Sequence, residues 1–145
     1  MAFADTRSSG RIVNGEISMF IVSDRDIITA RQQARAFADR AGFHPSDSIV
    51  MSTFISDVAR SVLASSKRAS ITIQLINDGS RRGIAIFAAG EAKNGHNSSQ
   101  SGAQLSSQLR IQSELSRLET KHVADEFEVF AGAPRGVSVK IIKWL

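Results

Sequence analysis

The chain has 145 residues, the size of one ordinary domain, so we expect a single hydrophobic core. Apolar residues make up 42% and charged residues 22%, with two prolines and ten glycines, which excludes wholesale disorder and collagen-like repeats. There are no cysteines, which excludes disulfides, thiol catalysis and cysteine-based zinc or iron–sulfur sites.

The charge pattern argues against a nucleic-acid partner. Eighteen Lys and Arg against fourteen Asp and Glu give a net charge of +4, which alone would favour a nucleic-acid-binding module. Residues 1–68 and 69–145 each contain nine basic and seven acidic residues, however, so no basic stripe stands out.

The hydropathy pattern predicts a cytoplasmic protein with no membrane partner. Its longest apolar runs have about six residues, against roughly 20 for a helix that spans a bilayer. The start, MAFADTRSSGR, lacks the apolar stretch of a signal peptide.

The first part of the chain predicts a strand and two helices. Residues 1–15 are rich in Ser, Gly and Arg and are interpreted as a flexible N-terminal arm, followed by a strand over residues 16–22. Ser23 is a candidate N-cap for an amphipathic helix that runs to residue 41. A second helix with a broad buried face is predicted over residues 45–63, with proline at its first turn.

The middle of the chain predicts a β-hairpin. After a polar turn at residues 65–68, apolar and polar residues alternate over 70–75, and a turn over 77–83 leads to a return strand at 84–88. The return strand is apolar on both faces, so we expect the second face of the sheet to be covered or to line a pocket.

The last part of the chain predicts a loop, a helix and a second hairpin. Residues 90–108 are polar and aperiodic, which indicates a mobile loop or lid, and a helix is predicted from residue 104 to about 124. Strands at 127–130 and 137–144 flank a Gly/Pro turn. The leucines expected to face the core from the helix are Leu105, Leu109, Leu115 and Leu118.

The predicted order of elements is β-α-α-β-β-α-β-β. Helices and strands that do not strictly alternate are typical of an α+β fold, here a two-layer sandwich with helices on one face of a mostly antiparallel sheet.

Several strings within this order carry a resemblance to a known family. They are Asp26 to Gln32 (DIITARQ), Met51 to Val62 (MSTFISDVARSV), Gly79 to Phe87 (GSRRGIAIF), Ala124 to Phe127 and Lys143 to Leu145. The chain thereby resembles the anti-sigma-factor serine/threonine kinases of the GHKL (Bergerat) ATPase superfamily, most closely the RsbT-type switch kinases of the stressosome. The resemblance covers residues 16–145 and implies one RsbT-like domain with the Bergerat, or histidine-kinase-type, ATPase fold.

The resemblance also implies a catalytic helix with altered groups. In that family a glutamate of the N box is the proposed general base, and an asparagine four residues later holds Mg²⁺ with the ATP phosphates. The matching residues here are Asp57 and Ser61, with Thr53 on the same helix face. Replacing Glu by Asp withdraws the carboxylate by roughly 1.5 Å, and a misplacement on the order of 1 Å lowers a rate about a hundredfold.

A second family element, an aspartate that accepts a hydrogen bond from the adenine amino group, is also changed. The aligned residues are Gly90 and Glu91, and the chain has no aspartate between Asp78 and Asp125. Loss of one hydrogen bond to a charged group costs about 1.5–3 kcal/mol, which weakens nucleotide binding roughly 10- to 150-fold.

The third family element is a glycine-rich GxGxG segment that lets backbone N–H groups approach the phosphates. The corresponding positions hold Gln112, Glu114 and Ser116, within a stretch that contains no glycine. The carboxylate of Glu114 would repel a triphosphate, so the resemblance implies a lid that has become a helix.

These three changes favour a signalling or switch protein that acts by protein–protein binding, with weak or lost ATP binding and no cofactor. The family implies a STAS-domain anti-anti-sigma or stressosome-type partner, and a downstream phosphatase is a further candidate. The residual nucleotide pocket would comprise Thr53, Asp57, Ser61, Gly90 and Glu91.

The alternative is an active serine/threonine protein kinase that uses ATP and Mg²⁺ to phosphorylate a STAS-domain partner. In that case Asp57 is the catalytic base, Ser61 is the Mg²⁺ ligand, and Glu91 replaces the aspartate that reads adenine.

Overall fold

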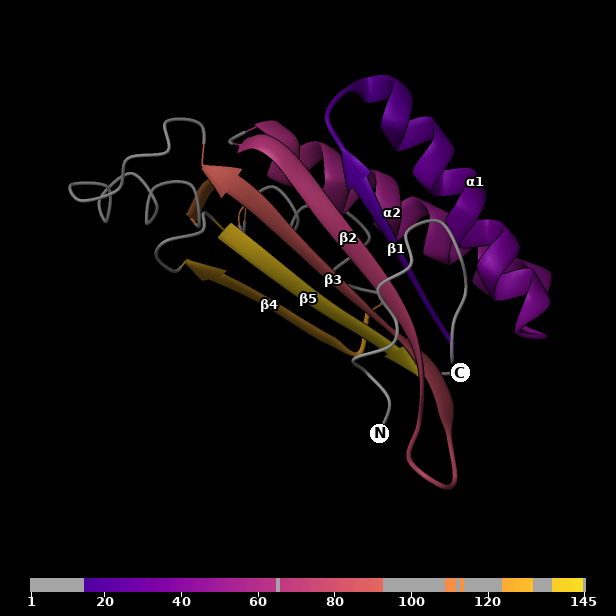
Figure 1. The fold of residues 1–145 in the computed structure, drawn as a ribbon. Helices are drawn as coiled ribbons and strands as arrows, with labels where there is room; N and C mark the ends of the chain where they lie inside the picture. Colours follow the sequence, from indigo (N-terminus) through magenta and orange to yellow (C-terminus); the bar gives the residue numbers. More distant parts are fainter. Residues whose placement is uncertain are drawn as a thin grey trace.

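The protein is an α+β two-layer sandwich, as predicted. The structure is a computed structural model that describes residues 15–64, 66–92, 109–111, 113, 124–131 and 137–144. Two helices cover one face of a five-stranded antiparallel sheet (Figure 1). The elements are β1 (Glu16–Ile21), α1 (Asp24–Arg40), α2 (Pro45–Ala64), β2 (Ser66–Asn77), β3 (Arg82–Ala92), β4 (Glu126–Ala131) and β5 (Val137–Trp144).

The sheet has the strand order β1-β2-β3-β5-β4, with every neighbouring pair antiparallel. The predicted hairpins, β2–β3 and β4–β5, are both present, and they join through β3 and β5. β3 is therefore the central strand, and β1 and β4 are the edges (Figure 1).

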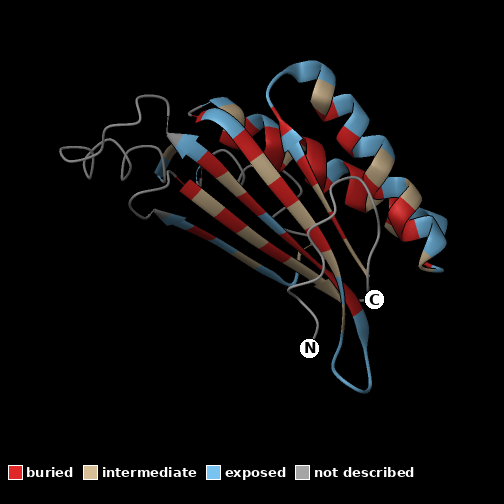
Figure 2. Ribbon diagram, in the orientation of Figure 1, coloured by how far each residue is buried: buried red, intermediate tan, exposed pale blue. Residues whose placement is uncertain are grey.

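The hydrophobic core lies between the sheet and the helices. Buried and less buried residues alternate along the strands (Figure 2), because successive side chains point to opposite faces. Ile71 and Ile73 of β2 are fully buried, as are Ile55 and Val58 of α2. We call the sheet face that α1 and α2 cover the helix face, and the opposite one the open face.

The second helix carries a row of buried serines one turn apart, namely Ser48, Ser52 and Ser56. The hydroxyls of Ser52 and Ser56 donate to backbone carbonyls of α2 itself, and Ser48 Oγ donates to Asp39 Oδ1 of α1 at 2.6 Å. Although α2 has 20 residues, none of the described helices is long and apolar enough to cross a membrane.

The start of α1 differs from the prediction in its capping group. Ser23 occupies the N-cap position, but its side chain makes no capping hydrogen bond. Asp26 in the first turn reaches back instead, and its carboxylate accepts a hydrogen bond from the Val22 N–H at 2.9 Å. The helix ends before Gly42, whose φ of +87° suits the left-handed turn that follows.

The central strands are longer than the sequence pattern indicated. The predicted polar turn at residues 65–68 is wrong for 66–68, which belong to β2, and residues 90–92 of the predicted loop belong to β3. Cross-strand pairing outweighs the polar composition there, since Arg68 pairs with Glu91 and their side chains form an ion pair of 3.3 Å. The rest of that loop, residues 93–108, lies outside the described residues.

The predicted helix over residues 104–124 is described only in part. Residues 109–111 and 113 are helical, whereas Ala124 is not. The predicted inward face is wrong at Leu109, which is 59% exposed, because Ile111 is the residue that enters the core. The other three leucines of the predicted stripe, the N-terminal arm over residues 1–14 and the turn over 132–136 lie outside the described residues.

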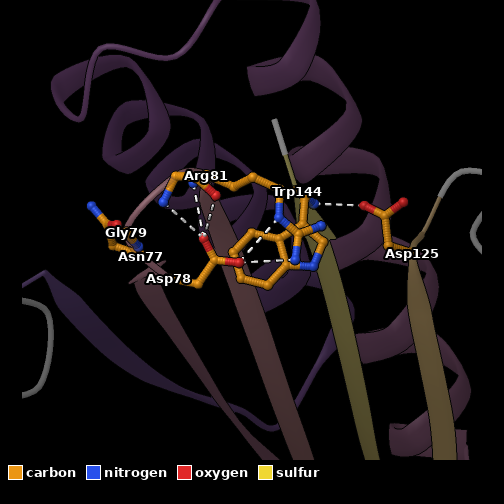
Figure 3. Close-up of polar contacts among 7 residues, drawn as sticks. Asn77, Asp78, Gly79, Arg81, Asp125 and Trp144 are labelled. Carbon is orange, nitrogen blue, oxygen red and sulfur yellow. Dashed lines mark hydrogen bonds and ion pairs between the residues drawn. The ribbon is translucent and has the colours of Figure 1, made fainter.

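The tip of the β2–β3 hairpin is tied to the end of β5 (Figure 3). Asp78 accepts hydrogen bonds from the backbone and the guanidinium of Arg81, and the same guanidinium lies 4.0 Å from the centroid of a Trp144 ring. The backbone N–H of Trp144 donates to Asp125 Oδ2 at 2.6 Å. Asp125, directly after the predicted end of the helix over residues 104–124, forms a bend that leads into β4.

These contacts predict the titration of Asp78. The side-chain hydrogen bond from Arg81, followed by the backbone N–H groups of Arg81 and Ser80, lowers the Asp78 pKa below its ordinary value of 3.8. Any stability that this carboxylate contributes is therefore present above its unfolded-state pKa and is lost as the pH falls through the lower folded-state pKa. We expect Arg81→Ala to raise the pKa towards 3.8, as measured by NMR titration of the carboxyl carbon. Arg82→Ala is the control, and equal pKa values in the Arg81 variant and the unaltered protein would contradict the assignment.

Candidate functional site

The predicted catalytic stripe lies along α2 and runs from the surface into the protein. Thr53 is exposed, and its hydroxyl donates to the Ile49 carbonyl of its own helix at 3.1 Å. Asp57 is half-buried, and Ser61 is only 4% exposed. Spacings of four residues place all three on one helix face, so the structure brings together this part of the predicted site.

The buried end of the stripe is covered by the helical residues 109–111. Arg110 Nη2 donates a hydrogen bond to the Ser61 backbone carbonyl at 3.0 Å, and Ile111 next to it is fully buried in the core. Asp57, Ser61 and Arg110 all have further interactions, so each is already engaged by the protein. Ser61 is therefore buried, and its backbone carbonyl is occupied by the Arg110 hydrogen bond.

Gly90 lies on the helix face of β3, where the chain passes very close to α2. A methyl group at this position would overlap Ser66 Oγ and lie 2.8 Å from Val62 Cγ1. A structural reason therefore exists for glycine here, because protein atoms occupy the space beside its Cα.

Glu91 is not brought together with Asp57 and Ser61. It follows Gly90 in β3, and adjacent strand residues point to opposite faces, so its side chain lies on the open face. There it is exposed and forms the ion pair with Arg68. The sheet thus separates Glu91 from the stripe on α2.

The remaining nucleotide-binding positions, Gln112, Glu114 and Ser116, lie outside the residues whose side chains are described. Within the described residues, no group of three or more His, Asp or Glu side chains is arranged to hold a metal ion.

Two cavities lined by described residues lie away from the predicted catalytic stripe. One, of about 310 Å³, lies between β1 and α1 and includes Asp26, Thr29 and Gln33 in its lining. The other, of about 370 Å³, lies on the open face around Phe87 and Ala89. The second cavity agrees with the expectation that the return strand lines a pocket on the sheet's second face.

The sequence reasoning missed Arg110. Its residue range was correctly predicted as helical, but nothing in the local pattern relates it to Ser61, which is 49 residues away. The sequence did contain one indication of this contact. Arg110 is a basic residue next to Ile111, just before the positions that match the family's glycine-rich segment.

Comparison with known proteins returns one relative. The chain is 26% identical to the serine/threonine-protein kinase RsbT of Bacillus subtilis (strain 168) over 144 residues, which covers 92% of this chain and 99% of that protein. No protein-family model matches the chain. The chain is therefore similar to RsbT along nearly all of its length.

The packing of residues 109–111 is testable by truncating Ile111. Because its side chain is fully buried, Ile111→Ala should lower the free energy of unfolding by about 2–4 kcal/mol. Leu109→Ala, two residues away and largely exposed, should change it by at most about 0.5 kcal/mol. Urea unfolding followed by circular dichroism measures both, and an Ile111→Ala cost as small as that of the control would contradict the packing.

The close approach at Gly90 is testable by a double-mutant cycle. Gly90→Ala should destabilise the protein by about 1–3 kcal/mol, and Ser66→Ala should reduce this cost by removing the nearest overlapping atom. Gly79→Ala is the comparison for backbone strain without overlap, since its φ is +97° and the space around it is open, so Ser66→Ala should leave the cost of Gly79→Ala unchanged. Additive effects of Ser66→Ala and Gly90→Ala in thermal unfolding would show that the two residues are not coupled.

Proposed function

We propose that this protein is an RsbT-like switch protein of a partner-switching system, in which it acts by protein–protein binding with weak or lost ATP binding. Its proposed partner is a STAS-domain anti-anti-sigma or stressosome-type protein, and a downstream phosphatase is a second candidate. We propose that it works in the cytoplasm and requires no cofactor. The similarity to RsbT along nearly the whole chain supports the family, and the altered site supports the mode of action.

The observation that carries this proposal is the contact between Arg110 and α2. In the family, the asparagine that matches Ser61 holds Mg²⁺ with the ATP phosphates. Here Ser61 is buried, and its backbone carbonyl accepts the Arg110 hydrogen bond. We infer that a triphosphate reaches Ser61 only after this contact breaks and the buried Ile111 beside it shifts; the burial of both Ser61 and Ile111 supports this inference. That cost opposes nucleotide binding before any ligand contact is made.

The position of Glu91 adds to this argument. Without a carboxylate in the place of the family's aspartate, one charged hydrogen bond to adenine is missing, which weakens binding by about 1.5–3 kcal/mol, or roughly 10- to 150-fold. Glu91 cannot replace that carboxylate while it lies on the open face paired with Arg68. Weak adenine recognition and a covered phosphate end both favour a binding function.

The second candidate is an active serine/threonine protein kinase, which the name of the relative favours. In this proposal Asp57, half-buried on α2, accepts the proton of the substrate hydroxyl, and Ser61 ligates Mg²⁺ once residues 109–111 have moved. Glu91 would have no adenine-reading role unless the end of β3 rearranged.

Isothermal titration calorimetry with Mg·ATP distinguishes the candidates. We expect no saturable binding with a dissociation constant near 10 μM or tighter, a threshold that corresponds to about −7 kcal/mol. We also expect a STAS-domain partner to bind with the same affinity in the presence and absence of Mg·ATP. Binding of Mg·ATP with a dissociation constant of about 10 μM or lower would refute the first candidate.

A phosphoryl-transfer assay tests the second candidate directly. The protein is incubated with a STAS-domain partner and γ-labelled ATP, and the switch proposal predicts no transfer above background. Asp57→Asn is compared with Asp47→Asn, a matched change of a half-buried aspartate near the start of the same helix. Transfer that persists in the Asp47 variant but is lost in the Asp57 variant would establish the kinase.

A further inference from the structure

The tip of the β2–β3 hairpin contains an Asp–Gly bond that is open to solvent. Asp78 and Gly79 lie between the end of β2 and the start of β3, and both are exposed. They form the only Asp–Gly pair of the sequence. Glycine has no side chain to shield its backbone nitrogen, and apart from the chain neighbours of Gly79 no atom of the described residues lies within 4 Å of where its Cβ would be. These are the features of a bond at which aspartate isomerises.

Isomerisation begins with attack of the Gly79 nitrogen on the side-chain carboxyl carbon of Asp78. A new C–N bond forms, and one carboxyl oxygen leaves as water with the proton of the carboxylic acid and the proton of the N–H group. The product is a cyclic imide. Water then adds to either imide carbonyl, so the ring opens to aspartate or to isoaspartate, and the water lost in the first step is regained. In isoaspartate the main chain runs through the former side chain and is longer by a methylene group.

The Asp78 carboxylate is held in a form that reacts poorly. The Arg81 guanidinium donates to Oδ2 from Nε at 3.1 Å and from Nη2 at 2.9 Å, and the Arg81 backbone N–H donates to Oδ1 at 2.9 Å (Figure 3). The Ser80 N–H also donates to Oδ1, at 3.1 Å. The side-chain hydrogen bond from Arg81 is the largest cause that lowers the Asp78 pKa, so the carboxyl group stays ionised. An ionised carboxylate resists attack, because it repels the nitrogen lone pair and cannot release water.

The attacking nitrogen is engaged as well. The Gly79 N–H donates to Asn77 Oδ1 at 2.8 Å, so it has to leave this acceptor before the nitrogen can attack. The Asp78 carboxyl group has to turn at the same time, although both of its oxygens accept hydrogen bonds. The strongest of these come from the Arg81 guanidinium, since hydrogen bonds between ionised groups are about twice as strong as neutral ones. The Arg81 side chain is therefore the main obstacle to the reaction.

We propose that Asp78–Gly79 is a site of isoaspartate formation that the Arg81 side chain suppresses. Arg81 is a positioning residue here, because it fixes the carboxylate and takes no part in the bonds that form or break. Its guanidinium is fixed in turn from β5, where it lies 4.0 Å from the centroid of a Trp144 ring (Figure 3). The site lies at the hairpin tip, and its chemistry does not depend on the proposed switch function.

Isoaspartate at this position would weaken the connection between the hairpin and β5. The carboxylate of isoaspartate is attached directly to Cα, so it no longer lies where the Asp78 carboxylate meets Arg81. The ion pair of 2.9 Å between the two residues is then lost, and the guanidinium beside Trp144 is held from one side only. The modification thus acts on the contact that joins the hairpin tip to the last strand.

Peptide mapping of the full chain after incubation at neutral pH tests the site. Electron-transfer fragmentation identifies isoaspartate at residue 78. The Asn–Gly pairs that begin at Asn14 and Asn94 are told apart, because deamidation changes the mass and isomerisation does not. We expect Arg81→Ala to form isoaspartate at residue 78 at least about threefold faster than the unaltered protein, since each pKa unit by which the carboxyl group rises gives about tenfold more neutral acid.

Arg82→Ala is the matched control. It removes the neighbouring arginine, whose guanidinium donates to the Ala41 carbonyl and lies over the Phe43 ring. We expect this variant to isomerise at the rate of the unaltered protein. Equal rates in Arg81→Ala and Arg82→Ala would overturn the proposal.

Two further variants separate the hold on the carboxylate from a general loosening of the tip. Arg81→Lys keeps the charge but loses the planar pair of donors, so its rate should lie between those of the unaltered protein and Arg81→Ala. Adding Gly79→Ala to Arg81→Ala should slow the reaction again, because a methyl group next to the nitrogen hinders its attack. Circular dichroism confirms that each variant is folded, and the full chain unfolded in urea gives the rate without the fold. An unaltered protein that isomerises as fast as the unfolded chain would contradict the suppression.

Discussion

The alternation of side chains along β3 is the constraint on which both faces of this protein depend. Ala88 and Gly90 point to the helices, so one is buried in the core and the other touches α2. Phe87 and Glu91 point the other way and remain accessible on the open face. A shift of one residue in the register would exchange these sets, exposing the core and burying a carboxylate, so core packing fixes which residues can act on which side.

Periodicity predicted the fold because most elements bury one face against a single core. The period of α1 and the alternation in β5 gave the correct elements, since burial there follows the sequence closely. Two details depended on long-range contacts and were missed. The polar residues before Ala69 are held in β2 by pairing with the end of β3, and Ile111 rather than Leu109 enters the core. Neither the start of β2 nor the burial of Ile111 can be predicted from a short stretch of the sequence alone.

The candidate site was predictable only where it lies on one helix. Four-residue spacing and the family resemblance were enough to place Asp57 and Ser61 on the same face of α2. The position of the Glu91 side chain could not be predicted without knowing where β3 ends. A loop residue can turn its side chain towards the helices, whereas the alternation of a strand fixes the face on which the side chain lies. The bond from Arg110 to the Ser61 carbonyl joins residues distant in sequence, so only the folded chain brings them together.

The contact between Arg81 and Trp144 gives the protein an internal optical reporter. Trp144 is the only tryptophan of the chain, and there is no tyrosine, so near-ultraviolet emission arises almost entirely from this indole. A guanidinium lies 4.0 Å from the centroid of its ring, at the tip of the β2–β3 hairpin (Figure 3). Fluorescence therefore records the attachment of the hairpin to β5, through the single indole that the Arg81 guanidinium contacts.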